Sequence, residues 1–203
     1  MSVVPLMVDF TDKKVVVVGG GPIAERRVHT LIEGEADIEV ISPDVTEGLF
    51  SLNAAKKIRW QQKYFSPEDA VDAFLIVAAS NDTSTNQAVI NASPSNALIN
   101  CVQEAEEGNV QFPTHCKRGR LSISVSTQGA SPILASQIKN DLEDKYDEGY
   151  EQYVDFLYEA RQLIKQTSLS PNERKVILRR LVEEDFFNKD KQVHMLHHLQ
   201  SQQ

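Results

Sequence analysis

Short apolar runs alternate with segments of helical spacing through the first half of the chain. The run KVVVVG at 14–19 is rich in β-branched residues and ends at glycine, which predicts a strand buried on both faces of a parallel sheet. The segment AERRVHTLIEGEA at 24–36 carries its apolar residues at helical spacing and predicts a helix that closes near Gly34. DIEVISP at 37–43 predicts a second strand, which ends at a proline.

Three more predicted strands follow the segment from Val45 to Ala55. They are KIRWQQKYF at 57–65, AFLIVAASND at 73–82 and NALINCVQ at 96–103, with a helix from about Ser84 into Ala92. Strands that alternate with helices indicate an α/β protein with a doubly wound parallel sheet and right-handed crossovers. We expect this Rossmann-type domain to cover residues 1–113.

A small region of different character follows at 114–147. LSISVST at 121–127 alternates as a strand does, QGASP predicts a turn, and ILASQIKNDLEDKY at 133–146 predicts an amphipathic helix. We interpret this region as a small α+β unit that follows the main domain.

The remaining residues, 148–203, contain no strand pattern and predict a helical C-terminal domain. Two helices are expected, at 150–169 and at 171–187. Ser170 can cap the second helix, and Pro171 suits its first turn. The tail HMLHHLQSQQ is polar, and we expect it to fray.

Composition narrows the possible functions. With 41% hydrophobic residues in 203 positions, the chain can form one good core and a smaller second one. No apolar run approaches the roughly 20 residues of a membrane span, and the N-terminus lacks a basic leader region, so we expect a cytoplasmic protein without a membrane partner. The net charge of -8 argues against a nucleic-acid partner. Cys101 and Cys116 lack metal-ligand spacing and are expected to be reduced thiols.

The three glycines after the first strand carry the most informative motif. Gly19, Gly21 and Ala24 form G-x-G-x-x-A directly after a strand and before a helix. In this context the first glycine allows a tight turn, the second lets the backbone approach a pyrophosphate, and the small third residue lets helix and strand pack closely. The helix N-terminus adds N–H groups and a positive dipole end. A purely structural glycine turn is the alternative.

The end of the second strand is the expected place for the adenosine ribose, since an acidic residue there binds its hydroxyls. Here the strand runs into Ser42, Pro43 and Asp44. Asp44 either binds the ribose or is only a turn residue after Pro43. No arginine follows immediately to hold a 2′-phosphate, so NAD is favoured over NADP.

Small residues at the end of the fourth strand leave room at the carboxyl edge of the sheet, where ligands bind in open α/β folds. We assign Ala79, Asn81 and Asp82 to the cofactor site. The alternative for Asn81 or Asp82 is an ordinary helix N-cap, and both roles can hold at once.

Four stretches together carry a family resemblance. They are VVVVGGGPIAERRVHTLIEGEADIEVISP, FLIVAASNDTSTNQAV, INCVQEAEEGNVQFPT and LSISVSTQGASPILASQIKNDLE. In this order and spacing they resemble the precorrin-2 dehydrogenases of sirohaem biosynthesis, including the N-terminal half of multifunctional sirohaem synthase. The resemblance covers residues 1–145 clearly, and STQGASPILA is its most specific part.

The resemblance implies NAD-dependent oxidation of precorrin-2 to sirohydrochlorin, in sirohaem or cobalamin biosynthesis. It implies a homodimer formed through residues 114–147 and a helical domain that helps to enclose the tetrapyrrole. The family's cofactor loop falls on Gly19, Gly21, Pro22, Ile23 and Ala24, with Pro43 and Asp44 beside the ribose. Some members of the family also insert a metal into sirohydrochlorin.

The substrate carries many carboxylates, so its pocket should offer cations. HCKRGR places His115 and three cations just beyond the predicted sheet: Lys117, Arg118 and Arg120. We assign these cations to substrate binding. A solvated basic turn is the alternative.

One departure from the family pattern concerns the acid–base chemistry. Where the family has a pair of aspartates, this chain has Gln103 and Glu104. Glutamine cannot act as a base, so the role passes to Glu104, to another group such as His115, or to water. Ser124 is a further candidate on the predicted strand, where a serine is otherwise merely tolerated. Because the pair is altered, we favour a dehydrogenase without chelatase activity over a bifunctional enzyme or a non-catalytic NAD-sensing module.

Two further sets of residues have a structural and a functional interpretation. The spacing of His194, His197 and His198 suits a metal, but a solvated helix face in a polar tail is favoured, and no metal site is expected. The aromatic and aliphatic residues of the first C-terminal helix are expected to form a core rather than a stacking platform for the tetrapyrrole; they are Tyr150, Tyr153, Phe156, Leu157 and Ile164.

Overall fold

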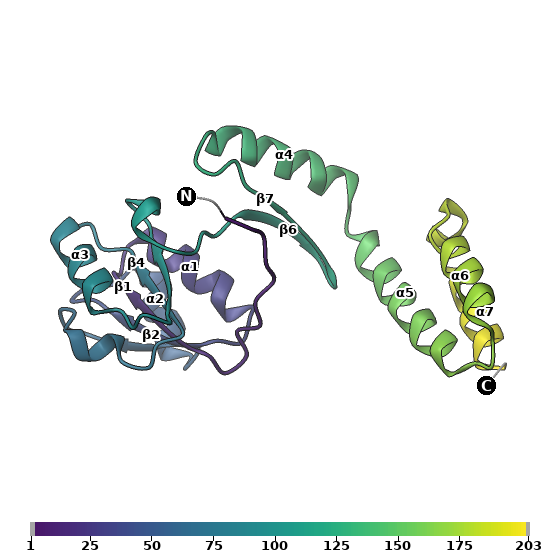
Figure 1. Cartoon of the computed structure of the whole chain (residues 1–203), viewed down its shortest axis with the longest axis horizontal. Coiled ribbons are helices and arrows are strands. Elements are labelled where there is room, and N and C mark those ends of the chain that lie inside the picture. The colour runs from purple at the N-terminus through teal and green to yellow at the C-terminus, as the bar shows by residue number, and fades with distance from the viewer. Residues whose placement is uncertain (1–2, 202–203) are drawn as a thin grey trace. The chain divides into compact units, whose positions relative to one another are not determined.

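The structure is a computed structural model that describes residues 3–201 of the chain (Figure 1). The chain forms two compact units, with the division between Phe112 and Pro113. Each unit has its own secondary structure and its own core, and each is described by itself below.

The first unit is built on five parallel strands in the order β3-β2-β1-β4-β5. The strands are β1 (Lys14–Val18), β2 (Asp37–Ile41), β3 (Arg59–Gln61), β4 (Leu75–Ala78) and β5 (Leu98–Cys101). Strand order reverses between β1 and β4. The strands β2 and β3 lie on one side of β1, and the strands β4 and β5 lie on its other side. The doubly wound parallel sheet predicted from the sequence is confirmed.

Helices cover both faces of this sheet. They are α1 (Pro22–Ile32), α2 (Glu47–Ala54) and α3 (Thr83–Ala92), with short 3-10 helices η1 (Pro67–Ala70) and η2 (Ala105–Glu107). Val15 and Val17 of β1 pack in the core that includes buried residues of α1 and α2. Val16 and Val18 pack in the core that includes Val89 of α3. The unbroken apolar run of β1 is therefore explained, since both of its faces are buried.

Two elements of the first unit differ from the pattern-based prediction. The segment 45–55, for which the pattern predicts no element, contains α2, which is capped by the Thr46 hydroxyl and buries only Leu49. A helix with one buried residue leaves little apolar periodicity to read. The predicted strand at 57–65 is much shorter, because only the three residues of β3 pair with β2.

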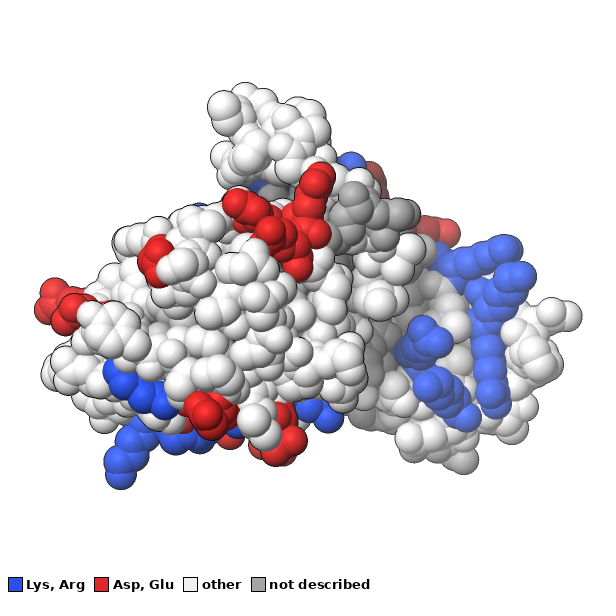
Figure 2. All heavy atoms as spheres, turned by 60° about the vertical axis from the view of Figure 1, so that its left-hand side comes forward, with Lys and Arg blue, Asp and Glu red and all other residues white. Residues whose placement is uncertain are grey.

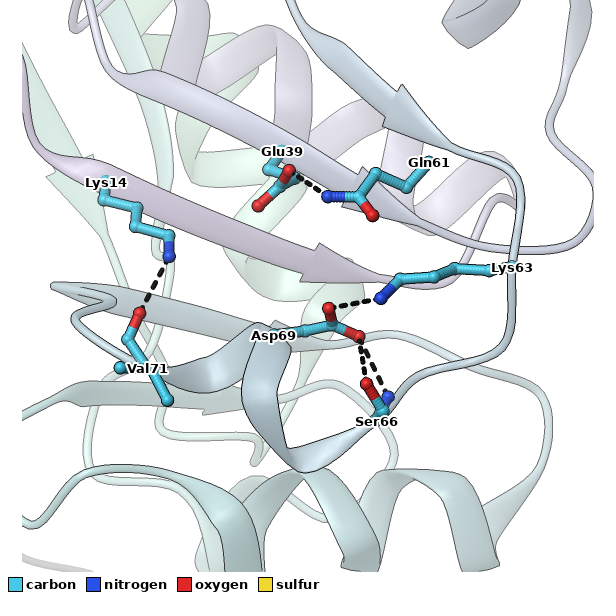
Figure 3. A network of polar contacts seen from close by, with 7 residues as sticks. All are labelled: Lys14, Glu39, Gln61, Lys63, Ser66, Asp69 and Val71. Carbon is cyan, nitrogen blue, oxygen red and sulfur yellow. Dashed lines mark hydrogen bonds and ion pairs between the residues drawn. The ribbon is translucent and has the colours of Figure 1, made fainter.

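A polar network lies on the face of the sheet that carries η1 (Figure 3). The Asp69 carboxylate accepts a hydrogen bond of 2.5 Å from Lys63 Nζ and one of 2.9 Å from the backbone N–H of Ser66. Burial acts to raise the pKa of Asp69, but the contacts with Lys63 and Ser66 together lower it below its ordinary value. In the same view the side chain of Gln61 on β3 donates to Glu39 on β2.

The second unit combines a β-hairpin with helices. Its elements are β6 (Thr114–Arg118), β7 (Leu121–Val125), α4 (Pro132–Lys145), α5 (Gly149–Gln166), α6 (Pro171–Arg180), the 3-10 helix η3 (Glu184–Phe187) and α7 (Lys189–Gln200). The strands pair antiparallel, and α4 contacts both of them. The predicted core of α5 is confirmed: Tyr153, Phe156 and Ile164 are buried, and Tyr150 and Leu157 pack against them.

The prediction of a frayed C-terminal tail is wrong for residues 194–200, which belong to α7, whereas residues 202–203 lie outside the described part of the chain. Asn188 caps α7 with its side chain, and Leu199 near the end of that helix is fully buried. Met195 and Leu196 pack against the same core, and the buried Gln192 side chain donates to the carbonyl of Phe186. The apolar residues of this segment are few and lie between histidines and other polar residues, so the pattern gives little sign of the face that packs in the core.

The prediction of one helix over 171–187 is also inexact. The α6 helix begins at Pro171, and Ser170 and Glu173 form a reciprocal capping box, which confirms the predicted start. It ends at Arg180, and the chain then forms η3.

The helices of residues 3–201 do not include one that is both long and apolar enough to cross a membrane.

We predict that Asp69→Ala destabilises the first unit by about 2 kcal/mol at pH 7, because it removes a cap and a charge-assisted hydrogen bond from a buried site. Urea unfolding followed by the fluorescence of Trp60, the single tryptophan of the chain, reports on this unit. Because the pKa of Asp69 is lowered on folding, its contribution is present at neutral pH and is lost as the pH falls below about 4.

Glu106→Ala, an exposed carboxylate of the same unit, is the control and should change stability by less than about 0.5 kcal/mol. Equal stability of Asp69→Ala and the unaltered protein at pH 7 would contradict the assigned role of Asp69.

Candidate functional site

The carboxyl edge of the parallel sheet gathers the loops that follow β1, β2 and β4. In open α/β sheets a crevice forms outside the carboxyl ends of the strands, at the point where strand order reverses. Here this point lies between β1 and β4, and the glycine loop leads directly from β1 into α1.

The first glycine is required by the fold itself. Gly19 has a positive φ of 126°, which residues with a side chain rarely adopt. A Cβ atom at Gly19 would collide with the carbonyl oxygen of Ala79 and lie 2.6 Å from its carbonyl carbon. The loop after β1 and the loop after β4 therefore touch backbone to backbone.

The second glycine is a site residue that the motif does not identify. A Cβ atom at Gly20 would collide with the Asp44 carbonyl oxygen and lie 2.8 Å from Ser42 Oγ. The Gly20 carbonyl also accepts a 2.9 Å hydrogen bond from the backbone N–H of Thr46. Gly20 thus joins the glycine loop to the turn after β2, and the only signal for it in the sequence is the unbroken row of three glycines.

The third glycine, Gly21, lacks the close backbone contacts of Gly19 and Gly20 within the described residues. A Cβ atom at Gly21 would meet no atom of residues 3–201 within 4 Å, and Gly21 is the N-cap of α1 in an extended conformation. The first-turn N–H groups of Ile23 and Ala24 have no intrahelical carbonyl to bind. The described part of the chain would not exclude a side chain here, so the open space beside Gly21 fits a bound diphosphate.

The turn after β2 is held rigidly. The Ser42 hydroxyl donates a 2.7 Å hydrogen bond to the carbonyl of Asp44, and the Trp60 indole donates to the carbonyl of Ser42 at 2.9 Å. Ser42 is 8% exposed, whereas Asp44 is exposed. From residue 37 to residue 55 the sequence contains no lysine or arginine. The carboxylate of Asp44 is therefore placed at the edge where a ribose is expected, next to the rigid Ser42 turn.

Asp82 after β4 is the N-cap of α3, which confirms the structural alternative. Its carboxylate accepts hydrogen bonds from the hydroxyls of Thr85 and Ser84, at 2.6 and 2.7 Å, and from their backbone N–H groups. These bonds lower the pKa of Asp82 to about 2. A contact of Ala79, Asn81 or Asp82 with a cofactor stays a prediction.

Gln103 and Glu104 follow β5 at the same edge. The Gln103 amide donates to the carbonyls of Ser80 and Asn81, at 3.3 and 3.5 Å. Glu104 precedes η2, and burial together with the Glu104 carboxylate raises the pKa of Glu107 above its ordinary value. Gln103 is thus bonded to the loop after β4, where an aspartate would have no hydrogen to donate.

The basic segment of the second unit is a strand and a hairpin turn, rather than only a basic turn. Within it His115 pairs directly with Ser124, and Lys117 with Ser122. Cross-strand partners share a face, so these four side chains lie on one face of the hairpin. Lys117 and Ser124 are exposed and His115 is half-buried. We call this set of four residues the polar hairpin face.

The other two cations are placed differently. Arg118 alternates to the opposite face, which also carries the buried Cys116. Arg120, in the turn, forms a 3.2 Å ion pair with Asp155, and its guanidinium carbon lies 3.7 Å from the centre of the Tyr158 ring. The structure therefore brings His115, Lys117 and Ser124 together and separates them from Arg118 and Arg120.

On the face drawn in Figure 2, lysine and arginine side chains lie in separate groups and do not form a continuous band. Within residues 3–201, side chains of His, Cys, Asp and Glu form no group of three that could hold a metal ion. His194, His197 and His198 all lie on α7.

Family models match three successive parts of the chain. A putative NAD(P)-binding family matches residues 6–114, the central family of sirohaem biosynthesis proteins matches 118–145, and the SirC C-terminal domain matches 150–195. The chain is 37% identical to the precorrin-2 dehydrogenase of Priestia megaterium over 181 residues, which cover 89% of this chain and 90% of that protein. The chain belongs to the precorrin-2 dehydrogenase family.

Two further comparisons agree with this membership. The precorrin-2 dehydrogenase of Bacillus subtilis strain 168 is 37% identical over 157 residues, which cover 77% of this chain and 97% of that protein. The solved structure of SirC, precorrin-2 dehydrogenase, superposes with a TM-score of 0.85 at 35% identity and covers 98% of this chain and 100% of its own. The first unit of this family member is therefore an NAD(P)-binding domain.

We predict that Gly20→Ala and Gly21→Ala separate the folding role from the cofactor role in this dehydrogenase. Gly20→Ala should destabilise the first unit by about 2 kcal/mol, because the new methyl group meets the backbone carbonyl of Asp44 and crowds the side chains of Ser42 and Val45. Gly21→Ala should keep its stability within about 0.5 kcal/mol, since the weaker N-cap is offset by a less flexible unfolded chain. It should nevertheless weaken NAD binding about tenfold or more, because its methyl group points into the cofactor space.

Calorimetric titration with NAD and urea unfolding measure the two effects. Unchanged NAD affinity in Gly21→Ala would show that the cofactor does not bind at this loop.

Proposed function

We propose that this protein is an NAD-dependent precorrin-2 dehydrogenase that converts precorrin-2 and NAD⁺ into sirohydrochlorin, NADH and a proton. The observation that carries the proposal is the open N-terminus of α1 beside Gly21, in a chain that belongs to the precorrin-2 dehydrogenase family over most of its length. The reaction moves a hydride and a proton, so the protein must mainly position the reactants and exclude water.

The residues at the carboxyl edge fit a dinucleotide. The N–H groups of Ile23 and Ala24, with the positive end of the α1 dipole, are suited to the diphosphate. Ala24 is fully buried, which lets α1 pack closely on β1. When bound, NAD⁺ supplies the nicotinamide that accepts the hydride. Gly19, Pro22, Ala79, Asn81 and Asp82 complete the proposed binding site.

NAD rather than NADP is the proposed cofactor. The exposed Asp44 carboxylate can accept hydrogen bonds from the ribose hydroxyls, whereas it would repel a 2′-phosphate. The stretch 37–55 contributes no cation to this edge, and its Glu47 adds a further negative charge. Ser42 and Pro43 form the turn itself, and their side chains are uncharged.

The polar hairpin face is the proposed contact for the substrate carboxylates. Lys117 offers a positive charge there, and Ser122 and Ser124 offer hydroxyl donors on the same face. Arg118 and Arg120 are proposed as weaker contacts for the same carboxylates. Arg118 lies on the opposite face of the hairpin, and the guanidinium of Arg120 already contacts Asp155 and Tyr158.

Three side chains are candidates for the proton that leaves the macrocycle. His115 stands directly opposite Ser124, so the two can act on one substrate group. Glu104 is a carboxylate near the end of β5. Gln103 cannot take up a proton, and for this reason we propose a dehydrogenase without chelatase activity.

A homodimer is proposed on the surface of α4. Ile133, Leu134 and Ile138 are 74%, 48% and 37% exposed on that helix, which buries only Ala135. Burial of such side chains against a second copy would remove apolar surface from water. Sedimentation analysis tests this directly, since a single species near the chain mass of 22.7 kDa would contradict it.

The proposed function predicts that anaerobic incubation of the protein with precorrin-2 and NAD yields sirohydrochlorin and NADH in equal amounts. Absorbance of the tetrapyrrole and of NADH, followed together, measures both products. NADP should be used at least about tenfold less efficiently, since Asp44 opposes the 2′-phosphate. Added cobalt should not be inserted faster than in protein-free controls. Binding of NAD without any turnover would favour the sensing module and contradict the enzyme.

We predict that Lys117→Ala raises KM for precorrin-2 about fivefold while KM for NAD stays unchanged, because one charge-assisted contact with a carboxylate is lost. Lys117→Arg should restore most of the affinity. Arg120→Ala is the matched control and should have the smaller effect, since Arg120 lies in the turn and not on the polar hairpin face. The assignment of the polar hairpin face would be wrong if Arg120→Ala raised KM and Lys117→Ala did not.

A further inference from the structure

The Ala79–Ser80 peptide after β4 forms one wall of the cofactor crevice. Its carbonyl carbon and the Ser80 nitrogen would lie 2.6 and 3.0 Å from a Cβ atom at Gly19, so the peptide and the glycine loop are in direct contact. A shift of this peptide by a few tenths of an ångström would therefore move the loop that the diphosphate approaches.

One buried side chain, that of Asn86, is hydrogen-bonded to Ser80. Asn86 of α3 is 2% exposed, and its amide oxygen accepts a 3.0 Å hydrogen bond from the N–H of Ser80. Its amide nitrogen donates a 2.9 Å hydrogen bond to the carbonyl of the same residue. Asn86 thus satisfies both polar groups of Ser80, as a neighbouring strand would.

A second amide supports the first. The Gln103 side chain donates to the carbonyls of Ser80 and Asn81, and its oxygen accepts from Asn86 and from the Thr83 hydroxyl, both at 3.3 Å. Gln103 follows β5, and Asn86 belongs to α3, so the loop after β4 is tied to two separate elements. The glycine loop contacts the same segment at Ala79 and Ser80.

We infer that Asn86, supported by Gln103, is a positioning residue of the dinucleotide site: it fixes the Ser80 peptide and so sets the wall against which the glycine loop and the cofactor rest. The inference rests on the NAD-binding part of the proposed function and does not depend on the oxidation of precorrin-2. It also explains why glutamine suits position 103, since only an amide can donate to the two carbonyls and accept from Asn86 at once.

Changing one amide to a carboxylate isolates this role. Asn86→Asp keeps the size of the side chain and its bond from the Ser80 N–H, but places an oxygen against the Ser80 carbonyl. Gln103→Glu makes the same change at an exposed position. Gln87→Glu, on the next residue of α3 and exposed to solvent, is the matched control for the added charge.

The test is calorimetric titration of the four full-length proteins with NAD, with their thermal unfolding recorded in parallel. Asn86→Asp should weaken NAD binding about tenfold and Gln103→Glu about threefold, while Gln87→Glu binds as the unaltered protein does. Saturating NAD should raise the melting temperature of Asn86→Asp less than that of the unaltered protein.

Unchanged NAD affinity in Asn86→Asp, with a lowered melting temperature, would reduce Asn86 to a folding role and overturn the inference. If Asn86→Asp does not fold, Gln103→Glu decides alone, and unchanged affinity there overturns it. Equal weakening in Gln87→Glu would attribute the effect to charge and also overturn it. If the unaltered protein bound no NAD, the proposed function would fall with the inference, whereas tight binding by unaltered and Asn86→Asp protein alike would remove the inference alone.

Discussion

The proposed cofactor site depends on the close approach of three backbone segments at the carboxyl edge of the sheet. Gly19 touches the Ala79–Ser80 peptide, and Gly20 touches the Asp44 carbonyl, so two of the three glycines hold the loops after β4 and β2 against the loop after β1. Gly21 is then left with open space in front of it and with the N-terminus of α1 behind it. Structural glycines thus create the surface, and one further glycine leaves room for the ligand.

The sequence could predict those parts of the fold in which local pattern and burial coincide. β1 is apolar throughout because both of its faces are buried, and the G-x-G-x-x-A spacing follows it directly. It could not predict α2 or the end of α7, where one or a few buried residues hold a helix among polar ones. The role of Gly20 could not be predicted either, because its contact with Asp44 forms only in the folded chain and corresponds to no motif in the sequence.

The alternation of β6 and β7 divides the basic segment in a way that composition alone cannot. In the sequence HCKRGR is one cluster of positive charge, but the side chains of neighbouring residues in a strand point to opposite faces. His115 and Lys117 therefore share a face with the serines of β7, while Arg118 turns to the covered side and Arg120 pairs with Asp155. In a chain with a net charge of -8, this local arrangement is the reason that we propose the polar hairpin face as the contact for an anionic substrate.

Amide hydrogen exchange of the full chain, with and without NAD, tests most directly whether the carboxyl edge is the cofactor site. The first unit also has a groove of about 620 Å³ at the opposite, amino edge of the sheet, lined in part by Asp12, Lys56 and Arg59. We expect NAD to slow exchange in residues 19–25 and to leave the segment 53–59 unchanged. Protection of 53–59 without protection of 19–25 would place the cofactor at the amino edge and contradict its assignment to the glycine loop.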